Sequence, residues 1–235
     1  MTTIRTKATG KEPKLPRTSD AQRARAAELL AALKARYPDA HCELNWSKPH
    51  ELLFATILSA QCTDVAVNKA TPALFARFPV VAAFASASPD AIEPYVRSLG
   101  FFRQKAKSIH TAAVALIERH GGEVPRTMEE LTALRGVARK TANVVLGNVF
   151  GLNLGVVVDT HVQRLAARFG LTRHSDPVKI ERDLMALFPQ PSWCLLSHLL
   201  IFHGRRACKA RNGLCTTDSI CQRFCSQAHP KKGKP

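Results

Sequence analysis

Residues 134–143 of this chain read LRGVARKTAN. Leu134 ends a short segment with helical spacing, Gly136 allows a tight turn, and helical spacing resumes at Arg139. The stretch therefore predicts two helices joined by a glycine hairpin, with Arg139 and Lys140 in the first turn of the second helix. Positive charge is unfavourable at a helix N-terminus, so this placement indicates that a cation here serves a function.

Helical spacing continues on both sides of the hairpin. Residues 52–60 and 139–150 are apolar on nearly every side, which predicts buried helices, and residues 102–116 lead to Gly121, a residue suited to end a helix. Further helix starts are marked by Ser19 with Gln22, Ser88-Pro89, Thr127 with Glu130, and Asp176-Pro177. No segment alternates apolar and polar residues, although 156–158 could be a short extended link. The sequence predicts an all-α fold.

The composition is that of a folded and strongly basic protein. The chain has 235 residues, 46% of them hydrophobic, and a net charge of +16 at pH 7. Such a charge favours a polyanion, most commonly nucleic acid; an anionic membrane or an acidic protein is a weaker alternative. No apolar run approaches the roughly 20 residues of a membrane span, and no apolar secretory segment opens the chain. We therefore expect no membrane association, and the seven cysteines to be reduced in a cytosol.

Two interpretations of the hairpin are open. A glycine hairpin followed by a helix can point successive backbone N–H groups at one phosphate, which would hold DNA without reading its bases. An ordinary corner between two helices is the alternative. Lys140 favours the first interpretation, because an amine beside Arg139 and at a helix N-terminus loses its proton more readily and becomes a nucleophile.

Other candidate residues lie outside the hairpin. Asp159 follows the apolar run 156–158 and precedes a helical segment, so it is at least an N-cap. Residues 58–64 read LSAQCTD, in which Gln61 is either the polar end of a helix or a contact residue. We expect Cys62 to be a small buried side chain.

Four cysteines gather near the end of the chain: Cys208, Cys215, Cys221 and Cys225. In a short, loop-rich segment of a cytosolic chain they predict a metal centre rather than disulfides. Iron–sulfur and zinc are both compatible with four thiolates, and loss of the metal is a third possibility. Cys42 and Cys194 are expected in the core, and His161 and His203 in core or supporting roles.

Taken in order, these motifs resemble the endonuclease III family of base-excision DNA glycosylases. The resemblance runs from about residue 24 to residue 225 and includes VDTH at 158–161. It implies a two-lobed, all-α helix-hairpin-helix glycosylase fold with a C-terminal four-cysteine iron–sulfur loop. We expect a flexible basic arm over 1–18, a six-helix domain over 43–153, a second lobe from 19–42 plus 154–228 that carries the cluster, and a basic tail over 229–235.

The resemblance also implies roles for individual residues. Lys140 would attack the sugar C1′ carbon and expel the damaged base, and the Schiff base would then permit strand cleavage. Asp159 would stabilise the cationic sugar and help to activate the lysine, while Gln61 would fill the gap left by the extruded nucleotide. The residues expected to hold the DNA backbone are Arg135, Gly136, Val137, Ala138 and Arg139.

This chain departs from the family pattern in the hairpin and in the cysteine spacing. Arg135 and Ala138 stand where the family usually has proline and glycine; Ala138 limits the backbone angles, and Arg135 adds a cation. The cysteines follow C-x6-C-x5-C-x3-C instead of C-x6-C-x2-C-x5-C, so Asp218 and Phe224 occupy two ligand positions of the family. We expect a shifted loop to let Cys221 and Cys225 complete a [4Fe–4S] cluster with Cys208 and Cys215, with zinc as the alternative.

The predicted function is base-excision repair of double-stranded DNA. The resemblance implies a bifunctional DNA glycosylase and AP lyase that removes oxidised pyrimidines and cleaves abasic sites by β-elimination. We expect a monomer in a bacterial cytoplasm, associated with the nucleoid. A monofunctional glycosylase is one alternative, against which Lys140 argues. A non-catalytic helix-hairpin-helix DNA-binding protein is another, and it would leave Lys140 and Asp159 without a role.

Overall fold

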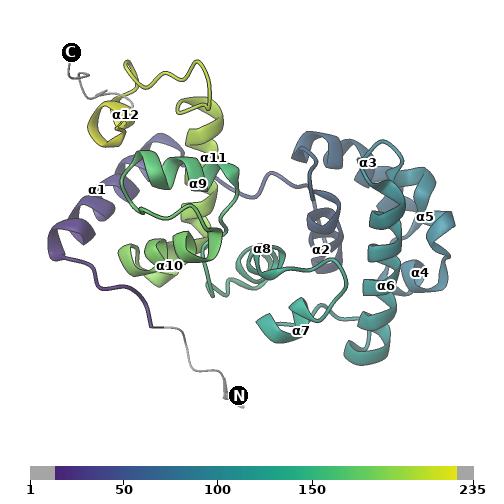
Figure 1. Cartoon of the computed structure of the whole chain (residues 1–235). Helices are drawn as coiled ribbons and strands as arrows, with labels where there is room; N and C mark the ends of the chain where they lie inside the picture. The colour runs from purple at the N-terminus through teal and green to yellow at the C-terminus, as the bar shows by residue number, and fades with distance from the viewer. Residues whose placement is uncertain (1–13, 227–235) are drawn as a thin grey trace.

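The computed structural model describes residues 14–226, and over this range all the regular secondary structure is helical (Figure 1). The predicted all-α class is confirmed. The helices form two lobes with separate hydrophobic cores, which we name the hairpin lobe (residues 43–153) and the cysteine lobe (residues 19–42 and 154–226). Most of the expected basic arm, and the whole of the expected basic tail, lie outside the described residues.

Seven helices lie in the hairpin lobe, one more than the six we expected. They are α2 (Pro49–Leu58), α3 (Asp64–Arg77), α4 (Val81–Ser86), α5 (Pro89–Val96), α6 (Phe102–His120), α7 (Met128–Thr132) and α8 (Arg139–Phe150). Helix α2 is the centre of the core, since every residue from His50 to Leu58 is buried, as its apolar sequence predicts. Phe54 of α2 and Phe84 of α4 meet edge to face with ring centroids 4.8 Å apart.

The cysteine lobe combines the first helix with the C-terminal third of the chain. Its elements are α1 (Asp20–Arg36), α9 (Thr160–Arg168), α10 (Pro177–Leu187), the 3-10 helix η1 (Gln190–Ser192), α11 (Trp193–Arg206) and α12 (Ser219–Phe224). Leu29 and Leu33 of α1 are fully buried in the same core as Phe202 of α11. The cysteine-bearing segment is therefore packed against the start of the chain.

Capping side chains begin the helices much as the sequence predicts. Ser19 and Gln22 form a complete capping box, and Asp176 caps α10 through the Lys179 N–H. At α7 the box is partial: the Thr127 hydroxyl accepts from the Glu130 N–H but donates at 2.6 Å to the Glu130 carboxylate. The Glu130 carboxylate therefore accepts a hydrogen bond from the Thr127 hydroxyl rather than from the backbone N–H of Thr127.

Helix α8 lies between the two lobes in Figure 1. Polar contacts join the lobes around it: His198 Nε2 on α11 is 2.9 Å from Asn148 Oδ1 on α8, and Arg205 of α11 forms ion pairs with Glu43 and Asp64. Helix α8 is thus in contact with both lobes. No helix among residues 14–226 is long and apolar enough to cross a membrane.

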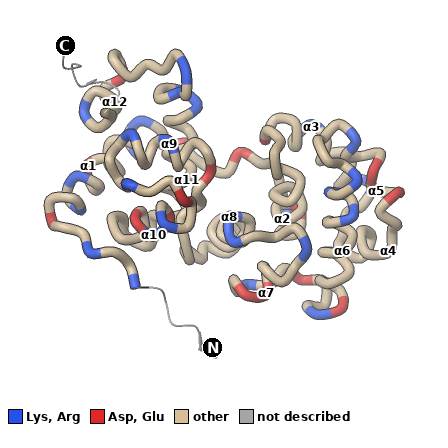
Figure 2. Tube along the Cα trace, in the orientation of Figure 1, with Lys and Arg blue, Asp and Glu red and all other residues tan. Residues whose placement is uncertain are grey.

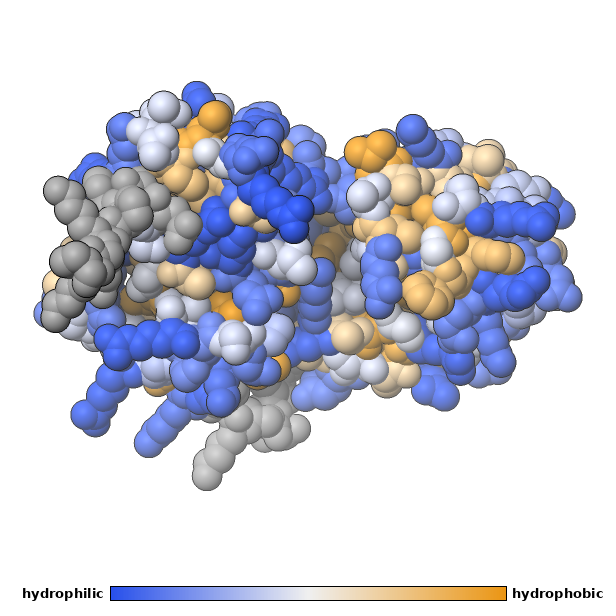
Figure 3. All heavy atoms as spheres, turned by 45° about the horizontal axis from the view of Figure 1, so that its top comes forward, coloured by the Kyte–Doolittle hydropathy of each residue, from blue (hydrophilic) through white to orange (hydrophobic). Residues whose placement is uncertain are grey.

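Lysine and arginine are spread over both lobes, including the start of α8 (Figure 2). The surface view shows a notch between the lobes, with hydrophilic side chains predominating on the cysteine lobe and hydrophobic side chains gathered on the hairpin lobe (Figure 3). Phe101 and Val65, both of the hairpin lobe, are the most exposed large hydrophobic residues of the described range, at 71% and 65%.

Candidate active site and four-cysteine centre

The hairpin is a tight turn packed on the core of its lobe. Leu134 and Val137 are buried, and the Val137 N–H donates to the Leu134 carbonyl at 3.2 Å. Gly136 between them has φ +82°, a left-handed conformation that favours glycine. A Cβ at this position would lie 3.2 Å from Ser108 Cβ and 3.3 Å from Ile57 Cγ2. Gly136 is therefore required both by its backbone angle and by its neighbours on α6 and α2.

The N-terminus of α8 lacks a capping side chain. Ala138 occupies the cap position with φ −91° and ψ 171°, extended backbone that any residue adopts, so alanine in place of glycine introduces no strain. The backbone N–H groups of Arg139, Lys140 and Thr141 have no hydrogen-bond partner among the described residues. Such free N–H groups at the positive end of a helix dipole are suited to bind an anion.

Lys140 and Asp159 both lie close to Asp64, the first residue of α3. Burial and the negative charge of Asp159 raise the pKa of Asp64, whereas the positive charges of Lys140 and His161 lower it. Lys140 is exposed and Asp159 is half-buried. The Asp159 carboxylate caps α9 by accepting from the Val162 N–H at 2.8 Å, so its expected role as an N-cap is confirmed. The fold thus brings the predicted lysine and aspartate to one region between the lobes.

Arg139 has a structural partner that the sequence did not reveal. Its Nε donates at 2.9 Å to Glu181 Oε2 on α10, and the other oxygen of this buried carboxylate accepts from Asn143 Nδ2 at 2.9 Å. Gly155 is required beside this network, because a Cβ there would overlap Glu181 Oε1. Glu181 joins the hairpin helix to the cysteine lobe, and the side chain of Arg139 is still 45% exposed. The charge of Arg139 is therefore partly balanced by Glu181, a partner that its position beside Lys140 did not reveal.

Gln61 and Phe101 lie on neighbouring turns of the hairpin lobe. Gln61 is exposed and left-handed, with φ +55°, in the turn between α2 and α3. Phe101, at the start of α6, is left-handed as well, with φ +57°. The two turns are joined through Lys105 of α6, whose backbone N–H donates to the Phe101 carbonyl and whose Nζ donates to Cys62 Sγ. We had not singled out Phe101; the pair of phenylalanines after Gly100 was the available signal.

The four C-terminal cysteines converge in the cysteine lobe. Their Sγ atoms all lie within 4.8 Å of one another, and each residue is at most 8% exposed. Helix α12 accounts for the altered spacing: Cys221 lies within it, and Cys225 is its C-cap, whose N–H donates to the Cys221 carbonyl at 2.8 Å. Asp218 instead caps α12 by accepting from the Ile220 and Cys221 N–H groups. Phe224 packs under the guanidinium of Arg25.

Two further side chains contact the cysteine sulfurs. Arg168 Nη1 donates to Cys208 Sγ at 3.2 Å, and His203, fully buried as expected, has Nε2 3.3 Å from Cys221 Sγ. A hydrogen bond from the Cys221 thiol and the nearby Arg168 lower the pKa of Cys208 to about 5, although burial opposes this. Four buried sulfurs with a thiolate among them are a donor set that fits a metal centre.

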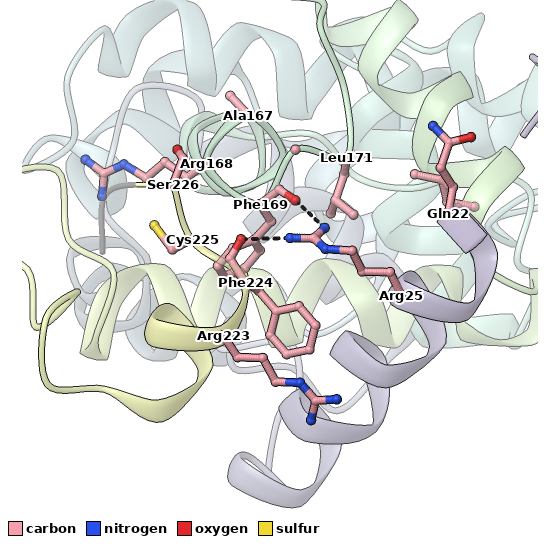
Figure 4. A pocket seen from close by; sticks show the side chains of 12 residues that line it. Gln22, Arg25, Ala167, Arg168, Phe169, Leu171, Arg223, Phe224, Cys225 and Ser226 are labelled. Carbon is pink, nitrogen blue, oxygen red and sulfur yellow. Dashed lines mark hydrogen bonds between the residues drawn. The ribbon is translucent and has the colours of Figure 1, made fainter. Parts of the chain in front are cut away.

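A pocket of about 480 Å³ lies beside this centre, between α1, the end of α9 and α12 (Figure 4). Arg25 crosses it, donating at 2.7 Å to the Phe169 carbonyl and at 3.0 Å to the Phe224 carbonyl. Neither Lys140 nor Asp159 lines the pocket. Arg25 of α1 thus connects the end of α9 with the end of α12.

Comparison with known proteins agrees with this architecture. Residues 54–190 match the HhH-GPD superfamily of base excision DNA repair proteins. Endonuclease III of Synechocystis sp. is 54% identical over 86% of this chain and 92% of its own length, and endonuclease III of Escherichia coli is 38% identical over 85% and 96%. A trapped endonuclease III–DNA covalent intermediate superposes with a TM-score of 0.83 at 39% identity, covering 88% of this chain and 96% of that one. A thermostable thymine-DNA glycosylase, 19% identical with a TM-score of 0.78, shares the fold.

The fold, together with the hairpin and its lysine, defines a helix-hairpin-helix protein of base excision DNA repair. The extent and identity of the matches are more specific than this class. The chain belongs to the endonuclease III family.

Proposed function

We propose that this chain is a bifunctional DNA glycosylase and AP lyase with Lys140 as its nucleophile. The observation that carries the proposal is the position of Lys140, in the uncapped first turn of α8 and in the same charged region as Asp159. The relatives named endonuclease III, and the covalent DNA intermediate formed by one of them, support it. A surface lysine with no catalytic role would need neither the nearby carboxylate of Asp159 nor the free N–H groups at the start of α8.

In the proposed reaction the Lys140 amine attacks the sugar C1′ carbon and the damaged base leaves with the electrons of the glycosidic bond. The Asp159 carboxylate, held by the Val162 N–H, stabilises the positive charge that develops on the sugar and accepts a proton from the attacking amine. The bond between C1′ and the ring oxygen then breaks, and this oxygen takes up a proton. The lysine is left joined to C1′ as a Schiff base, which acidifies the neighbouring carbon. Loss of a proton from that carbon expels the 3′ phosphate and cleaves the strand.

The DNA is held by its backbone and opened at the lesion. The N–H groups at the start of α8 bind one phosphate, and the exposed guanidinium of Arg135 adds a charged contact. Gly136, Val137 and Ala138 shape this turn. Gln61 enters the space left by the extruded nucleotide, and the exposed ring of Phe101 provides an apolar surface against the neighbouring bases.

The substrate class that we propose is duplex DNA with an oxidised pyrimidine or an abasic site, bound by a monomer in a bacterial cytoplasm, at the nucleoid. Cys208, Cys215, Cys221 and Cys225 would hold a [4Fe–4S] cluster, with zinc as the alternative. When bound, the metal centre would connect α12 and the loop before it, and so support the basic residues of this loop against DNA.

The proposal is tested on two duplex oligonucleotides, one with thymine glycol and one with an abasic site. We expect the protein to cleave both, and Lys140→Gln to bind both with unchanged affinity but to cleave neither. Lys69→Gln, which removes an exposed lysine of α3, is the matched control and should cleave normally. Base release without strand cleavage would indicate the monofunctional alternative. Binding of both duplexes without any reaction would indicate a DNA-binding protein.

A further inference from the structure

Lys105 is a buried cation outside the proposed reaction site. It lies on α6 and is 5% exposed. Its Nζ is 2.9 Å from Cys62 Sγ, and this sulfur is the one polar partner of the ammonium group among the described residues. Cys62 itself is half-buried rather than buried as expected, so solvent reaches the residue.

A neutral thiol is a poor partner for a buried ammonium ion. Removing a charge from water costs several kcal/mol unless an opposite charge or several hydrogen bonds replace the water. A thiol sulfur is only a weak acceptor, whereas a thiolate supplies a full negative charge. Lys105 therefore holds its ammonium group against the Cys62 sulfur, where it would stabilise a thiolate that reacts with an electrophile.

The other cysteines have different surroundings. Burial raises the pKa of Cys42, and burial raises the pKa of Cys194 to about 11, so both remain thiols at neutral pH. Neither has a lysine or arginine partner among the described hydrogen bonds. The four C-terminal cysteines belong to the metal centre. Outside the metal centre, Cys62 is thus the cysteine of the described residues whose sulfur has a lysine as its hydrogen-bond partner.

We propose that Cys62 is a modification site, which hydroperoxides oxidise to sulfenic acid with the help of Lys105. The thiolate sulfur attacks one peroxide oxygen, so that an S–O bond forms and the O–O bond breaks. The sulfur loses two electrons and the peroxide gains them. The leaving hydroxide takes a proton from the Lys105 ammonium and becomes water. A thiol reductant reverses the change by way of a mixed disulfide.

Oxidation at Cys62 has a consequence for Gln61, and this step rests on the proposed function. The Cys62 N–H donates to the Ser59 carbonyl at 3.0 Å, which closes the turn that holds Gln61 in its left-handed conformation. An added oxygen does not fit between atoms 2.9 Å apart, so the turn has to move. Sulfenic acid at Cys62 therefore lowers the affinity for lesion-containing DNA until a reductant restores the thiol.

The experiment treats the full-length, metal-loaded protein with less than one equivalent of hydrogen peroxide in the presence of dimedone. Labelling of each cysteine is followed by mass spectrometry. We expect Cys62 to be labelled at least about tenfold faster than Cys42 and Cys194, which serve as internal controls. Lys105→Met should reduce the rate at Cys62 to that of the controls, while Lys105→Arg should largely retain it. Equal rates at the three cysteines in the unchanged protein would overturn the proposal, and this comparison needs no variant.

A second measurement separates the modification site from its effect on DNA. Affinity for a duplex with a stable abasic-site analogue is measured before oxidation, after oxidation and after reduction. We expect a loss of about tenfold or more that reduction reverses, and no loss in Cys62→Ala. Labelling at Cys62 without a change in affinity would overturn the effect on Gln61. If the unoxidised protein does not bind the duplex, the proposed function fails, while the labelling rates still decide the status of Cys62.

Discussion

Lys140, Gly136 and Ala138 of the hairpin are exposed to solvent, whereas each of the four C-terminal cysteines is at most 8% exposed. The hairpin obtains its shape from the chain itself, through the left-handed Gly136 and the packing of Val137. The cysteine centre brings four sulfurs within 4.8 Å, an arrangement that fits a metal centre. The hairpin can therefore be exposed, because local packing fixes its backbone. We expect the cysteine centre to depend on a bound metal instead.

Removal of the metal is the change with the largest expected effect, and it should destabilise the cysteine lobe only. Cys221→Ser, or chelation, should cost more than about 4 kcal/mol of unfolding free energy in the cysteine lobe, because the sulfurs lose the ion that joins them. Hydrogen exchange should then show lost protection in α12, while α2 and α6 of the hairpin lobe stay protected. Equal loss of protection in both lobes would mean that the hairpin depends on the metal as well.

Substitutions of Asp159 separate its proposed catalytic role from its role as the N-cap of α9. Asp159→Asn keeps a side chain that can cap α9 and should leave the thermal midpoint unchanged, but should lower strand cleavage by about 100- to 1,000-fold. Asp159→Ala should lose the same activity and, in addition, about 1 kcal/mol of stability. Asp176→Asn, at the cap of α10, is the matched control and should cleave normally. Normal cleavage by Asp159→Asn would show that the carboxylate charge has no part in the reaction.

His198 of α11 contacts helix α8 of the hairpin lobe. We expect it to make the unfolding free energy of the protein dependent on pH. Its Nε2 lies 2.9 Å from Asn148 Oδ1 on the hairpin helix, and burial lowers its pKa from 6.5 to about 4. The unfolded chain therefore takes up a proton first as the pH falls. The stability contribution is complete above about pH 6.5, and up to about 3 kcal/mol of it is lost as the pH falls toward 4.

Denaturant unfolding at several pH values between 7.5 and 4 measures this dependence. His198→Gln should flatten the curve over that range, whereas His174→Gln, which removes an exposed histidine, should not. An unchanged slope in His198→Gln would place the acid sensitivity elsewhere in the protein.

Substitutions in the hairpin should have the smallest effects and should differ between two neighbouring positions. Gly136→Ala forces a Cβ into a left-handed residue, 3.2 Å from Ser108 Cβ, and should cost about 1–2 kcal/mol together with some DNA affinity. Ala138→Gly should change stability by no more than about 0.5–1 kcal/mol, because Ala138 is already in extended backbone. Thermal unfolding and duplex binding measure both. Greater damage at Ala138 would contradict the hairpin geometry.

Local sequence signals predicted the hairpin region well. Helix α8 begins at Arg139 and ends at Phe150, as the apolar run indicated, and the capping residues of α1, α5 and α10 were recognisable. Contacts between residues far apart in the chain were not predictable. Glu181 is 42 positions from Arg139, and no sequence pattern near either residue predicts their ion pair. The sequence also could not predict that alanine is tolerated at position 138, because this depends on the backbone angles of that residue in the folded protein.

In the cysteine region the sequence predicted which residues gather but not how. The count of four cysteines indicated a metal centre, while the altered spacing left the ligands uncertain. In the structure, Asp218 stands where the family has a cysteine, and it caps the short helix α12 instead of joining the four sulfurs. A six-residue helix has too little periodicity to be recognised from its apolar pattern.

The proposed reaction requires that Lys140 forms the covalent bond to DNA. Borohydride reduction during the reaction with an abasic-site duplex, followed by digestion and mass spectrometry of the adduct, measures this most directly. We expect the sugar remnant to be attached to Lys140 and Lys140→Gln to form no adduct. An adduct on another lysine, or trapping that persists in Lys140→Gln, would contradict it.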